Sequence, residues 1–341
     1  MKRFGVLAAA AIAVMTFTAP AKAGETLDAI KARGHLQCIV NTGLAGFGIA
    51  DSQGKWVGLD IDYCRALAAA ILGDANAVKY TPTTAQQRFT ALQSGEGDVL
   101  ARNTTWTLTR DASLGFNFVG VNFYDGQGFM VKKDLGVTSS KELDGAEVCV
   151  QTGTTTELNL ADYFRARNMS FKPVVFEDLA ESITAFFNGR CQVYTTDASG
   201  LASIRATEAP DPSAYVILPE IISKEPLGPV VRRGDDEFFA VAKWVLYALL
   251  DAEEKGITSA NVDDMRANSQ DPNVQRLLGA SGDMADKIGL SKDWAYNAIK
   301  QAGNYGEMFA RNVGPDTPLK LERGLNALWT EGGLMYAPPI R

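Results

Sequence analysis

Short apolar runs alternate with helical patterns in two successive stretches of this chain. The first stretch has strand-like runs at residues 36–40, 77–80 and 98–101, with helices that begin at residue 62 and cover residues 88–93. The second has strand-like runs at residues 147–151, 172–176 and 191–196, with helices near residues 158–165 and around Ile183, Phe186 and Phe187. Strands that alternate with helices form parallel sheets, because each return to the same edge needs a crossover. The pattern predicts an α/β protein of two lobes, each a mainly parallel sheet flanked by helices.

Two extended segments that carry glycine, residues 126–131 and 228–233, suggest paired crossings between the lobes. Lobe 1 is then discontinuous and consists of residues 24–128 and 232–341, while lobe 2 consists of residues 129–231. The chain after these crossings is mostly helical, with helices expected over residues 238–254, 259–268, 294–303 and 319–329. The first of these helices is apolar around much of its circumference, so we expect this helical C-terminal extension to pack on lobe 1.

The N-terminus has the pattern of a secretory signal peptide. Residues 2 and 3 are basic, residues 5–15 are apolar, and residues 21–23 form a small-x-small cleavage site. The apolar run is too short for a membrane anchor, which takes about 20 residues. We therefore expect residues 1–23 to be removed after Ala23 and the mature protein to be free in the periplasm.

The charge balance and the single histidine exclude several classes of function. With 33 Lys and Arg against 40 Asp and Glu the formal net charge is −7, and no basic block offsets it, so we expect no nucleic-acid partner. His35 alone cannot supply a Ser-His or Cys-His catalytic system with a recognisable pattern. Neither a Walker loop nor a G-x-G-x-x-G turn after a strand occurs, so we expect no nucleotide cofactor.

Four cysteines in a chain with a signal peptide indicate two disulfides, for which three connectivities exist. Cys38 lies on the apolar face of its strand and Cys64 on the apolar face of its helix, so a bridge within one lobe is plausible. Cys149 and Cys191 each open a β-rich run, and on neighbouring parallel strands their Cα atoms would fall within the roughly 4.4 to 6.8 Å that a disulfide requires. We predict the pairs 38 with 64 and 149 with 191. A zinc site is disfavoured because no C-x-x-C occurs, so we expect no metal.

Residues 98–110 form a short apolar strand that ends in hydroxyl and amide side chains, followed by Arg110. Arginine presents a planar fork of N–H donors that matches a carboxylate, and Thr and Asn can hold the remaining oxygens without adding charge. The run therefore favours a loop that binds a carboxylate. The alternative is an ordinary loop or helix cap.

Three segments give the chain a resemblance to a known family. They are Gly54-Lys55-Trp56-Val57-Gly58-Leu59-Asp60-Ile61-Asp62, Arg102-Asn103-Thr104-Thr105-Trp106-Thr107-Leu108-Thr109-Arg110 and Gln151-Thr152-Gly153-Thr154-Thr155-Thr156-Glu157. The first, which leads into a helix, resembles the signature of the solute-binding proteins of polar amino-acid ABC transporters, also called family 3. The other two look like the general L-amino-acid binders within it. The resemblance covers about residues 26–341 and implies the type II periplasmic binding protein fold, with the ligand between the lobes.

The resemblance also implies which residues hold the ligand. Arg110 would pair with the α-carboxylate, with contacts from Asn103 and Thr105. From lobe 2, Thr155 at a helix start would meet the same carboxylate. Asp197, at the end of a strand, would accept hydrogen bonds from the α-ammonium group. Structural roles compete with both lobe 2 assignments, because the Thr-Thr-Thr-Glu run is also a capping box and aspartate is a good helix N-cap.

The wall around the ligand side chain is less defined. Many relatives carry a stacking aromatic where this chain has Leu44, and Phe47 could take over that wall, although core packing would explain Phe47 equally well. Trp106 and Arg88 could also shape the side-chain pocket, unless they only cover apolar surface. A pocket that recognises chiefly the α-amino and α-carboxyl groups would accept many side chains.

The function implied by the resemblance is capture of L-amino acids in the cleft and delivery to the membrane permease of an ABC transporter. Such a protein is not an enzyme, needs no cofactor and is expected to be a monomer. Two alternatives stay open at this point: a periplasmic enzyme on the same fold that resembles the cyclohexadienyl dehydratases, and a sensor coupled to a chemoreceptor. An enzyme would need an added general acid near the bound carboxylate, and no residue is marked for that role.

Overall fold

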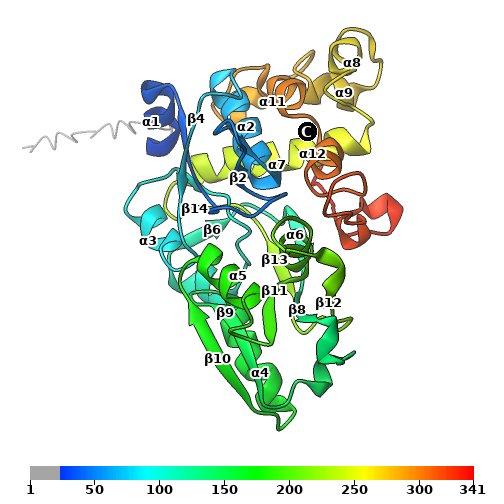
Figure 1. Ribbon diagram of the computed structural model, residues 1–341. Coiled ribbons are helices and arrows are strands. Elements are labelled where there is room, and N and C mark those ends of the chain that lie inside the picture. The colour runs from blue at the N-terminus through cyan, green and yellow to red at the C-terminus, as the bar shows by residue number, and fades with distance from the viewer. Residues whose placement is uncertain (1–23) are drawn as a thin grey trace, which may run out of the picture.

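Two five-stranded sheets, one in each lobe, form the body of the protein, with helices around both (Figure 1). The computed structural model describes residues 24–341, and the expected signal peptide lies outside the described residues. The predicted α/β class with two lobes is confirmed.

The sheet of lobe 1 has the strand order β4-β1-β5-β14-β6. β1 pairs in parallel with β4 and β5, whereas β14 runs antiparallel between β5 and β6. The strands are β1 (Leu36–Val40), β4 (Val78–Pro82), β5 (Val99–Leu100), β6 (Phe116–Phe118) and β14 (Val230–Arg232). The other elements before the crossing are α1 (Glu25–Arg33), a small pair of strands β2 (Ile49–Ala50) and β3 (Trp56–Val57), α2 (Leu59–Leu72) and α3 (Arg88–Gln93). The helices α2 and α3 join the three parallel strands, as the alternating pattern predicts.

The sheet of lobe 2 repeats this arrangement with the order β10-β9-β11-β8-β12. β9 pairs in parallel with β10 and β11, and β8 runs antiparallel between β11 and β12. The strands are β8 (Gln127–Lys132), β9 (Ala146–Gln151), β10 (Phe171–Phe176), β11 (Val193–Asp197) and β12 (Tyr215–Ile217), and the helices are α4 (Thr155–Ala166), α5 (Leu179–Phe187) and α6 (Ala198–Thr207). In both sheets the antiparallel strand is the one that adjoins a crossing.

The two lobes are joined by a separate antiparallel pair, β7 (Phe123–Asp125) and β13 (Glu225–Leu227). The glycine-bearing segments expected to be the crossings lie mostly inside the sheets, as β8 and β14. Only glycine fits at position 228, because an added Cβ would clash with the carbonyl oxygen of Gly120. The glycine pattern thus located the crossings only to within a few residues, and the lobe boundaries at residues 128 and 231 stay a prediction.

The C-terminal part is helical and packs on lobe 1 (Figure 1). Its helices are α7 (Asp236–Glu254), α8 (Val262–Asn268), α9 (Pro272–Leu277), α10 (Met284–Lys287), α11 (Trp294–Ala302) and α12 (Tyr305–Asn312). α11 and α12 contact both α2 and α7, and their buried residues belong to the same core as those of β1. The helix expected over residues 319–329 is wrong. That segment has only short 3₁₀ turns, at Gly324–Asn326 and from Trp329 on, and the positive φ of Lys320 at +51° is incompatible with a continuous helix.

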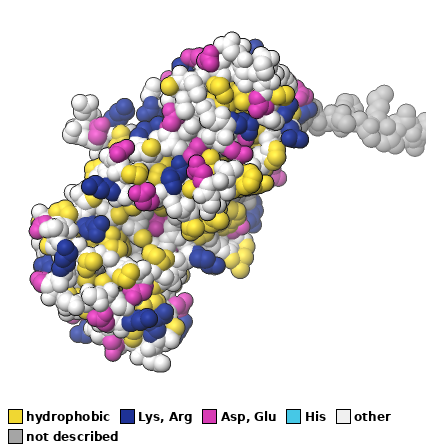
Figure 2. Space-filling view, turned by 90° about the vertical axis from the view of Figure 1, so that its right-hand side faces the viewer, with side chains coloured by type: hydrophobic (Ala, Val, Ile, Leu, Met, Phe, Trp, Pro, Cys, Tyr) yellow, Lys and Arg dark blue, Asp and Glu magenta, His cyan; other side chains and the backbone are white. Residues whose placement is uncertain are grey.

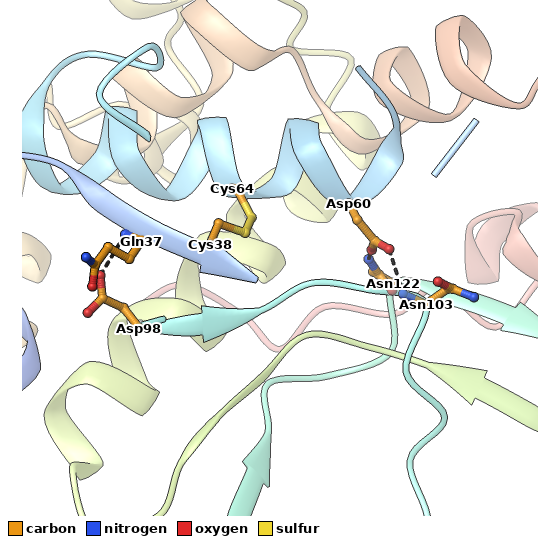
Figure 3. The surroundings of a disulfide bond; sticks show 7 residues. All are labelled: Gln37, Cys38, Asp60, Cys64, Asp98, Asn103 and Asn122. Atoms are coloured by element: carbon orange, nitrogen blue, oxygen red, sulfur yellow. Dashed lines mark hydrogen bonds between the residues drawn. A yellow bond between two sulfur atoms is a disulfide. The ribbon is translucent and has the colours of Figure 1, made fainter. Parts of the chain in front are cut away.

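Two disulfides fasten the lobes internally. Cys38 on β1 is joined to Cys64 on α2, with 6.4 Å between the Cα atoms (Figure 3). Cys149 on β9 is joined to Cys191, which precedes β11, with a Cα separation of 5.7 Å. This is the pairing that the strand and helix positions predict. Each bridge ties a central strand to a neighbouring element of the same lobe.

The longest apolar helix, α7, lies in the core and buries Phe238, Val241 and Val245. Within residues 24–341, no helix is both long enough and apolar enough to span a bilayer. On the face seen in Figure 2, Lys and Arg side chains lie among Asp and Glu side chains.

Candidate functional site

A polar cavity, here called the interlobe cavity, lies where strands of both sheets end. From lobe 1 it is lined by Asn41, Leu44, Arg88, Arg102, Asn103 and Thr105. From lobe 2 it is lined by Gln151, Thr154, Thr155, Thr156, Leu179, Thr196, Asp197, Gly200 and Ile204. Ligands of open α/β sheets bind at this place, beyond the carboxyl ends of the strands. Of the predicted ligand contacts, the structure brings together Asn103, Thr105, Thr155 and Asp197.

The loop after β5 is held in place by Asp60, the first acid of the segment at residues 54–62 that resembles the family signature. The Asn103 N–H donates to Asp60 Oδ2 at 2.7 Å, and Asn122 Nδ2 donates to Asp60 Oδ1 at 3.0 Å (Figure 3). Asn103 has a φ of +33°, a backbone conformation that Asn adopts more readily than most residues. Its side chain accepts a hydrogen bond from Asn41 Nδ2 at 2.9 Å. Asp60, at the start of α2, therefore positions the loop at the edge of the interlobe cavity.

Asp197 ends β11 and occupies the N-cap position of α6, yet its side chain makes no cap hydrogen bond. The capping alternative is thereby excluded for this residue. Burial raises the pKa of Asp197 well above its usual value, and the nearby Asp125 and Glu225 raise it further, while Arg88 and Arg110 oppose the rise. When burial and nearby acids raise the pKa of a carboxyl group in this way, a cation placed beside it stabilises the ionised form. The position suits an ammonium group.

At the start of α4, the helix cap and the residue predicted to contact the ligand are two different threonines. Thr154 Oγ1 accepts a hydrogen bond from the Glu157 N–H at 3.2 Å, so Thr154 is the cap. Thr155, the first helical residue, donates through its hydroxyl to Glu225 Oε2 at 2.8 Å. Its Oγ1 also lies 3.2 Å from Thr105 Oγ1 of lobe 1. Hydroxyl groups of both lobes therefore meet at a helix N-terminus, whose first N–H groups have no partner within the helix.

Glu225 is a residue next to the site that the sequence pattern does not mark. It lies on the crossing strand β13 and is 1% exposed. Its carboxylate accepts hydrogen bonds from Thr105 at 2.6 Å, Thr155 at 2.8 Å, Asn159 at 2.7 Å and Ser223 at 2.6 Å. Because Thr105 and Thr155 belong to opposite lobes, Glu225 links them at the hinge. Its role depends on the pairing of β7 with β13, which no local sequence signal reports.

Arg110 lies just behind the cavity lining, in a π-helical turn at Thr109–Ser113. It is buried, and its Nη1 donates to the Thr105 carbonyl oxygen at 3.0 Å. Its guanidinium lies 5.1 Å from the centre of the Phe89 ring. Burial lowers the pKa of Arg110 to about 10, opposed by Glu225 and Asp197, so the group stays charged at neutral pH.

Trp106 and Phe47 are not part of the cavity lining. Trp106 is 39% exposed and stacks on Phe118 with 5.4 Å between the ring centres. Phe47 is buried, and its ring meets Phe123 edge to face at 5.2 Å. Leu44, the position that corresponds to the stacking aromatic of many relatives, does line the cavity.

Two further arginines line the interlobe cavity. Arg88 begins α3, and its Nη2 reaches the Gly153 carbonyl oxygen of lobe 2 at 3.4 Å. Arg102 follows β5 and donates from Nε to the Thr83 carbonyl oxygen at 3.0 Å. Burial lowers the pKa of Arg102 to about 10, so it is also charged at neutral pH. The cavity therefore presents both a carboxylate and guanidinium groups. Within residues 24–341, His, Cys, Asp and Glu side chains form no group of three or more that could hold a metal ion.

Asp125, on β7, should make the ligand-free protein less stable as the pH rises. Burial raises its pKa to about 6, although hydrogen bonds from Ser199 and the Gly126 N–H act in the opposite direction. A carboxyl group with a higher pKa in the folded chain stabilises the fold below its unfolded pKa, and this stabilisation is lost as the pH rises through about 6. We expect the melting temperature of wild type, relative to Asp125→Asn, to be higher at about pH 5 than at about pH 7.5.

Asp211→Asn serves as the control for this measurement. Asp211 is exposed, and hydrogen bonds from Ser213 hold its pKa below the usual value, so it does not titrate between these two pH values. The difference in melting temperature between Asp211→Asn and wild type should be the same at both pH values. If the difference between Asp125→Asn and wild type were also the same at both, the raised pKa of Asp125 would be contradicted.

Comparison with known proteins adds a family and several relatives. The family described as bacterial extracellular solute-binding proteins, family 3, matches residues 36–261, about two thirds of the chain. The general L-amino acid-binding periplasmic protein AapJ of Rhizobium johnstonii is 57% identical over 343 aligned residues, which cover 100% of both chains. The glutamate/glutamine/aspartate/asparagine-binding protein BztA of Rhodobacter capsulatus is 58% identical over 97% of both chains.

A solved structure is also similar over most of the molecule. It is an ABC transporter periplasmic binding protein from Brucella ovis with glutathione bound. The two chains are 55% identical with a TM-score of 0.90, and the match covers 93% of this chain and 99% of that one.

Proposed function

The chain belongs to the bacterial extracellular solute-binding proteins of family 3, and we propose that it captures L-amino acids in the interlobe cavity and delivers them to the permease of an ABC transporter. The proposal places the protein in the periplasm as a soluble carrier, after removal of residues 1–23. We expect it to act as a monomer.

The observation that carries the proposal is the place of Asp197. Its carboxylate lines the interlobe cavity from lobe 2 without capping a helix, and it faces guanidinium groups of lobe 1. A zwitterion needs an anion for its ammonium group and cations or N–H donors for its carboxylate. Asp197 supplies the first, and Arg110, Thr105 and Thr155 supply the second. Because these groups come from both lobes, a bound amino acid favours the closed arrangement of the lobes.

Relatives support both the class of ligand and its breadth. AapJ is named for general L-amino-acid binding and BztA for binding glutamate, glutamine, aspartate and asparagine. The Brucella ovis protein was solved with glutathione bound. Glutathione carries an α-ammonium and an α-carboxylate group on its γ-glutamyl residue, so the same contacts could hold it. We therefore include glutathione as a second candidate ligand of the same site.

The enzyme alternative would need a general acid free to act on the ligand. The oxygens of Asp60 and Glu225 are taken by hydrogen-bond donors of the protein, and under this proposal Asp197 is used on the ligand ammonium group. The relatives named above are binding proteins. A sensor coupled to a chemoreceptor would bind the same ligand in the same cavity and differ only in the protein to which it then docks.

Isothermal titration calorimetry of refolded, ligand-free protein tests the proposal. The panel comprises the standard L-amino acids, several D-enantiomers and glutathione. Dissociation constants in the micromolar range or below, about −8 kcal/mol or stronger, are expected for several L-forms and few D-forms. Absence of heat with every member of the panel would contradict it.

A further inference from the structure

The hydroxyl groups of Thr105 and Thr155, which meet across the interlobe cavity, are both used on Glu225. Thr105 of lobe 1 donates to Glu225 Oε2 at 2.6 Å, and Thr155 of lobe 2 donates to the same oxygen at 2.8 Å. A threonine hydroxyl has a single hydrogen to donate. With both hydrogens on Glu225, the two Oγ1 atoms, 3.2 Å apart, have none left for each other or for a ligand.

The second oxygen of Glu225 is also fully used. Oε1 accepts from Asn159 Nδ2 at 2.7 Å and from the Ser223 hydroxyl at 2.6 Å. An ionised carboxylate has about four positions for hydrogen bonds, and these four donors fill them. Glu225 is also 1% exposed. Its side chain therefore cannot turn away from the two threonines without leaving a buried carboxylate short of donors, which is costly.

This arrangement decides what Thr105 and Thr155 offer to a ligand. Their hydroxyl oxygens present lone pairs toward the cavity, and a ligand carboxylate consists of acceptors as well. The negative charge of Glu225 adds repulsion at short range. The donors that stay available are the N–H groups at the start of α4 and the part of the Arg110 guanidinium that is not used on the Thr105 carbonyl oxygen.

We propose that Glu225 limits the affinity of the interlobe cavity, because it holds the hydroxyl groups of Thr105 and Thr155 as acceptors toward the ligand α-carboxylate. The inference rests on the proposed function and names a positioning residue of the same site, which acts on the ligand through the two threonines. A carrier has to release its ligand, and weaker binding mostly reflects faster dissociation.

Glu225→Gln tests the proposal, because glutamine keeps the shape of the side chain and removes its charge. Its amide nitrogen, in the place of Oε2, donates to both threonines, and each hydroxyl can then turn its hydrogen toward the ligand. In titration calorimetry this variant should bind L-glutamine about threefold to tenfold more tightly than wild type. 4-Aminobutanamide, which lacks the α-carboxylate, should not bind more tightly.

Glu220→Gln is the matched control. Glu220 also accepts hydrogen bonds in lobe 2, from the Ser139 hydroxyl at 2.6 Å and the Ser140 N–H at 3.0 Å, but it does not line the interlobe cavity. This variant should leave the affinity for both ligands unchanged.

The outcomes separate the inference from the proposed function. Unchanged or weaker binding of L-glutamine by Glu225→Gln, or an equal gain for L-glutamine and 4-aminobutanamide, would overturn the role of Glu225 and leave amino-acid binding intact. Failure of wild type to bind any amino acid would instead overturn the proposed function.

Thr155→Val gives a second test that does not need Glu225→Gln to fold. Valine has nearly the shape of threonine and keeps the backbone N–H, but it has no hydroxyl. Because that hydroxyl uses its hydrogen on Glu225, its loss should weaken L-glutamine binding by less than about threefold. A hydroxyl that donates to the ligand carboxylate would cost about tenfold or more, and this result would overturn the proposal.

The double variant of Glu225→Gln and Thr155→Val completes the cycle. In Glu225→Gln the Thr155 hydroxyl does face the ligand, so adding Thr155→Val should remove most of the gain in affinity. A gain that persists in full would show that Glu225 does not act through Thr155. Circular dichroism and thermal melting without ligand check that each variant folds.

Discussion

Asp197→Asn should lower the affinity for L-amino acids by about 2 to 5 kcal/mol, roughly 30-fold or more, because it leaves the ligand ammonium group buried without an anion. The same substitution should raise the melting temperature of the ligand-free protein at neutral pH. Burial and the neighbouring Asp125 and Glu225 raise the pKa of Asp197, so its ionised form destabilises the fold as the pH rises. Calorimetry and thermal melting measure the two effects.

These opposite signs separate ligand binding from a capping role. Asp178→Asn is the matched control, because Asp178 is the N-cap of α5 in the same lobe and does accept a hydrogen bond, from the Glu181 N–H at 2.9 Å. It should leave the affinity unchanged. A variant of Asp197 that keeps its affinity and melts at a lower temperature would assign the residue to the fold instead.

Arg110→Gln should have an effect of similar size, about 2 to 5 kcal/mol in affinity, because it removes the guanidinium that we propose pairs with the ligand α-carboxylate. Arg110 is buried, and it also holds the Thr105 carbonyl oxygen at 3.0 Å, so the loop after β5 loses part of its support. Arg110→Lys keeps the charge but loses the planar fork, and we expect an intermediate loss. Titration calorimetry of both variants checks the order.

Arg233→Gln is the control for this pair. Arg233 is half-exposed in the same lobe, where it pairs with Asp111 at 3.4 Å, and its loss should not alter the affinity. Affinity close to wild type in Arg110→Gln would shift the α-carboxylate to Arg102 or Arg88, which line the cavity.

Local patterns were sufficient to predict the parallel part of both sheets. β1 and α3 have the predicted bounds, because strand and helix patterns of that length are set by neighbouring residues. The region of residues 319–329 was not predictable in this way. Its apolar residues have a helical spacing, but Lys320 and Gly324 adopt positive φ values of +51° and +49°. The short α12 escaped prediction, although the capping box of Asn304 and Glu307 is a local signal for it.

The site residues were predicted from the family resemblance, because strand ends and helix starts alone fit capping roles equally well. Asp197 ends β11 and Thr155 begins α4 after the loop that follows β9, and both line the interlobe cavity. Glu225 could not be recognised as a site residue, because its position depends on how the crossing strands and the two lobes meet. Arg102 follows a predicted strand end, but no sequence pattern marked it as a ligand contact. Phe47 is three residues from Leu44, yet its ring packs into the core, since a sequence distance does not say which way a loop residue points.

The central claim is that the interlobe cavity recognises both charges of an amino-acid zwitterion. The most direct test is calorimetry of ligand-free protein with L-glutamine, with 4-carbamoylbutanoate, which lacks the ammonium group, and with 4-aminobutanamide, which lacks the α-carboxylate. We predict micromolar or tighter binding of L-glutamine and binding at least about 30-fold weaker for each analogue. Equal binding of L-glutamine and either analogue would contradict the account.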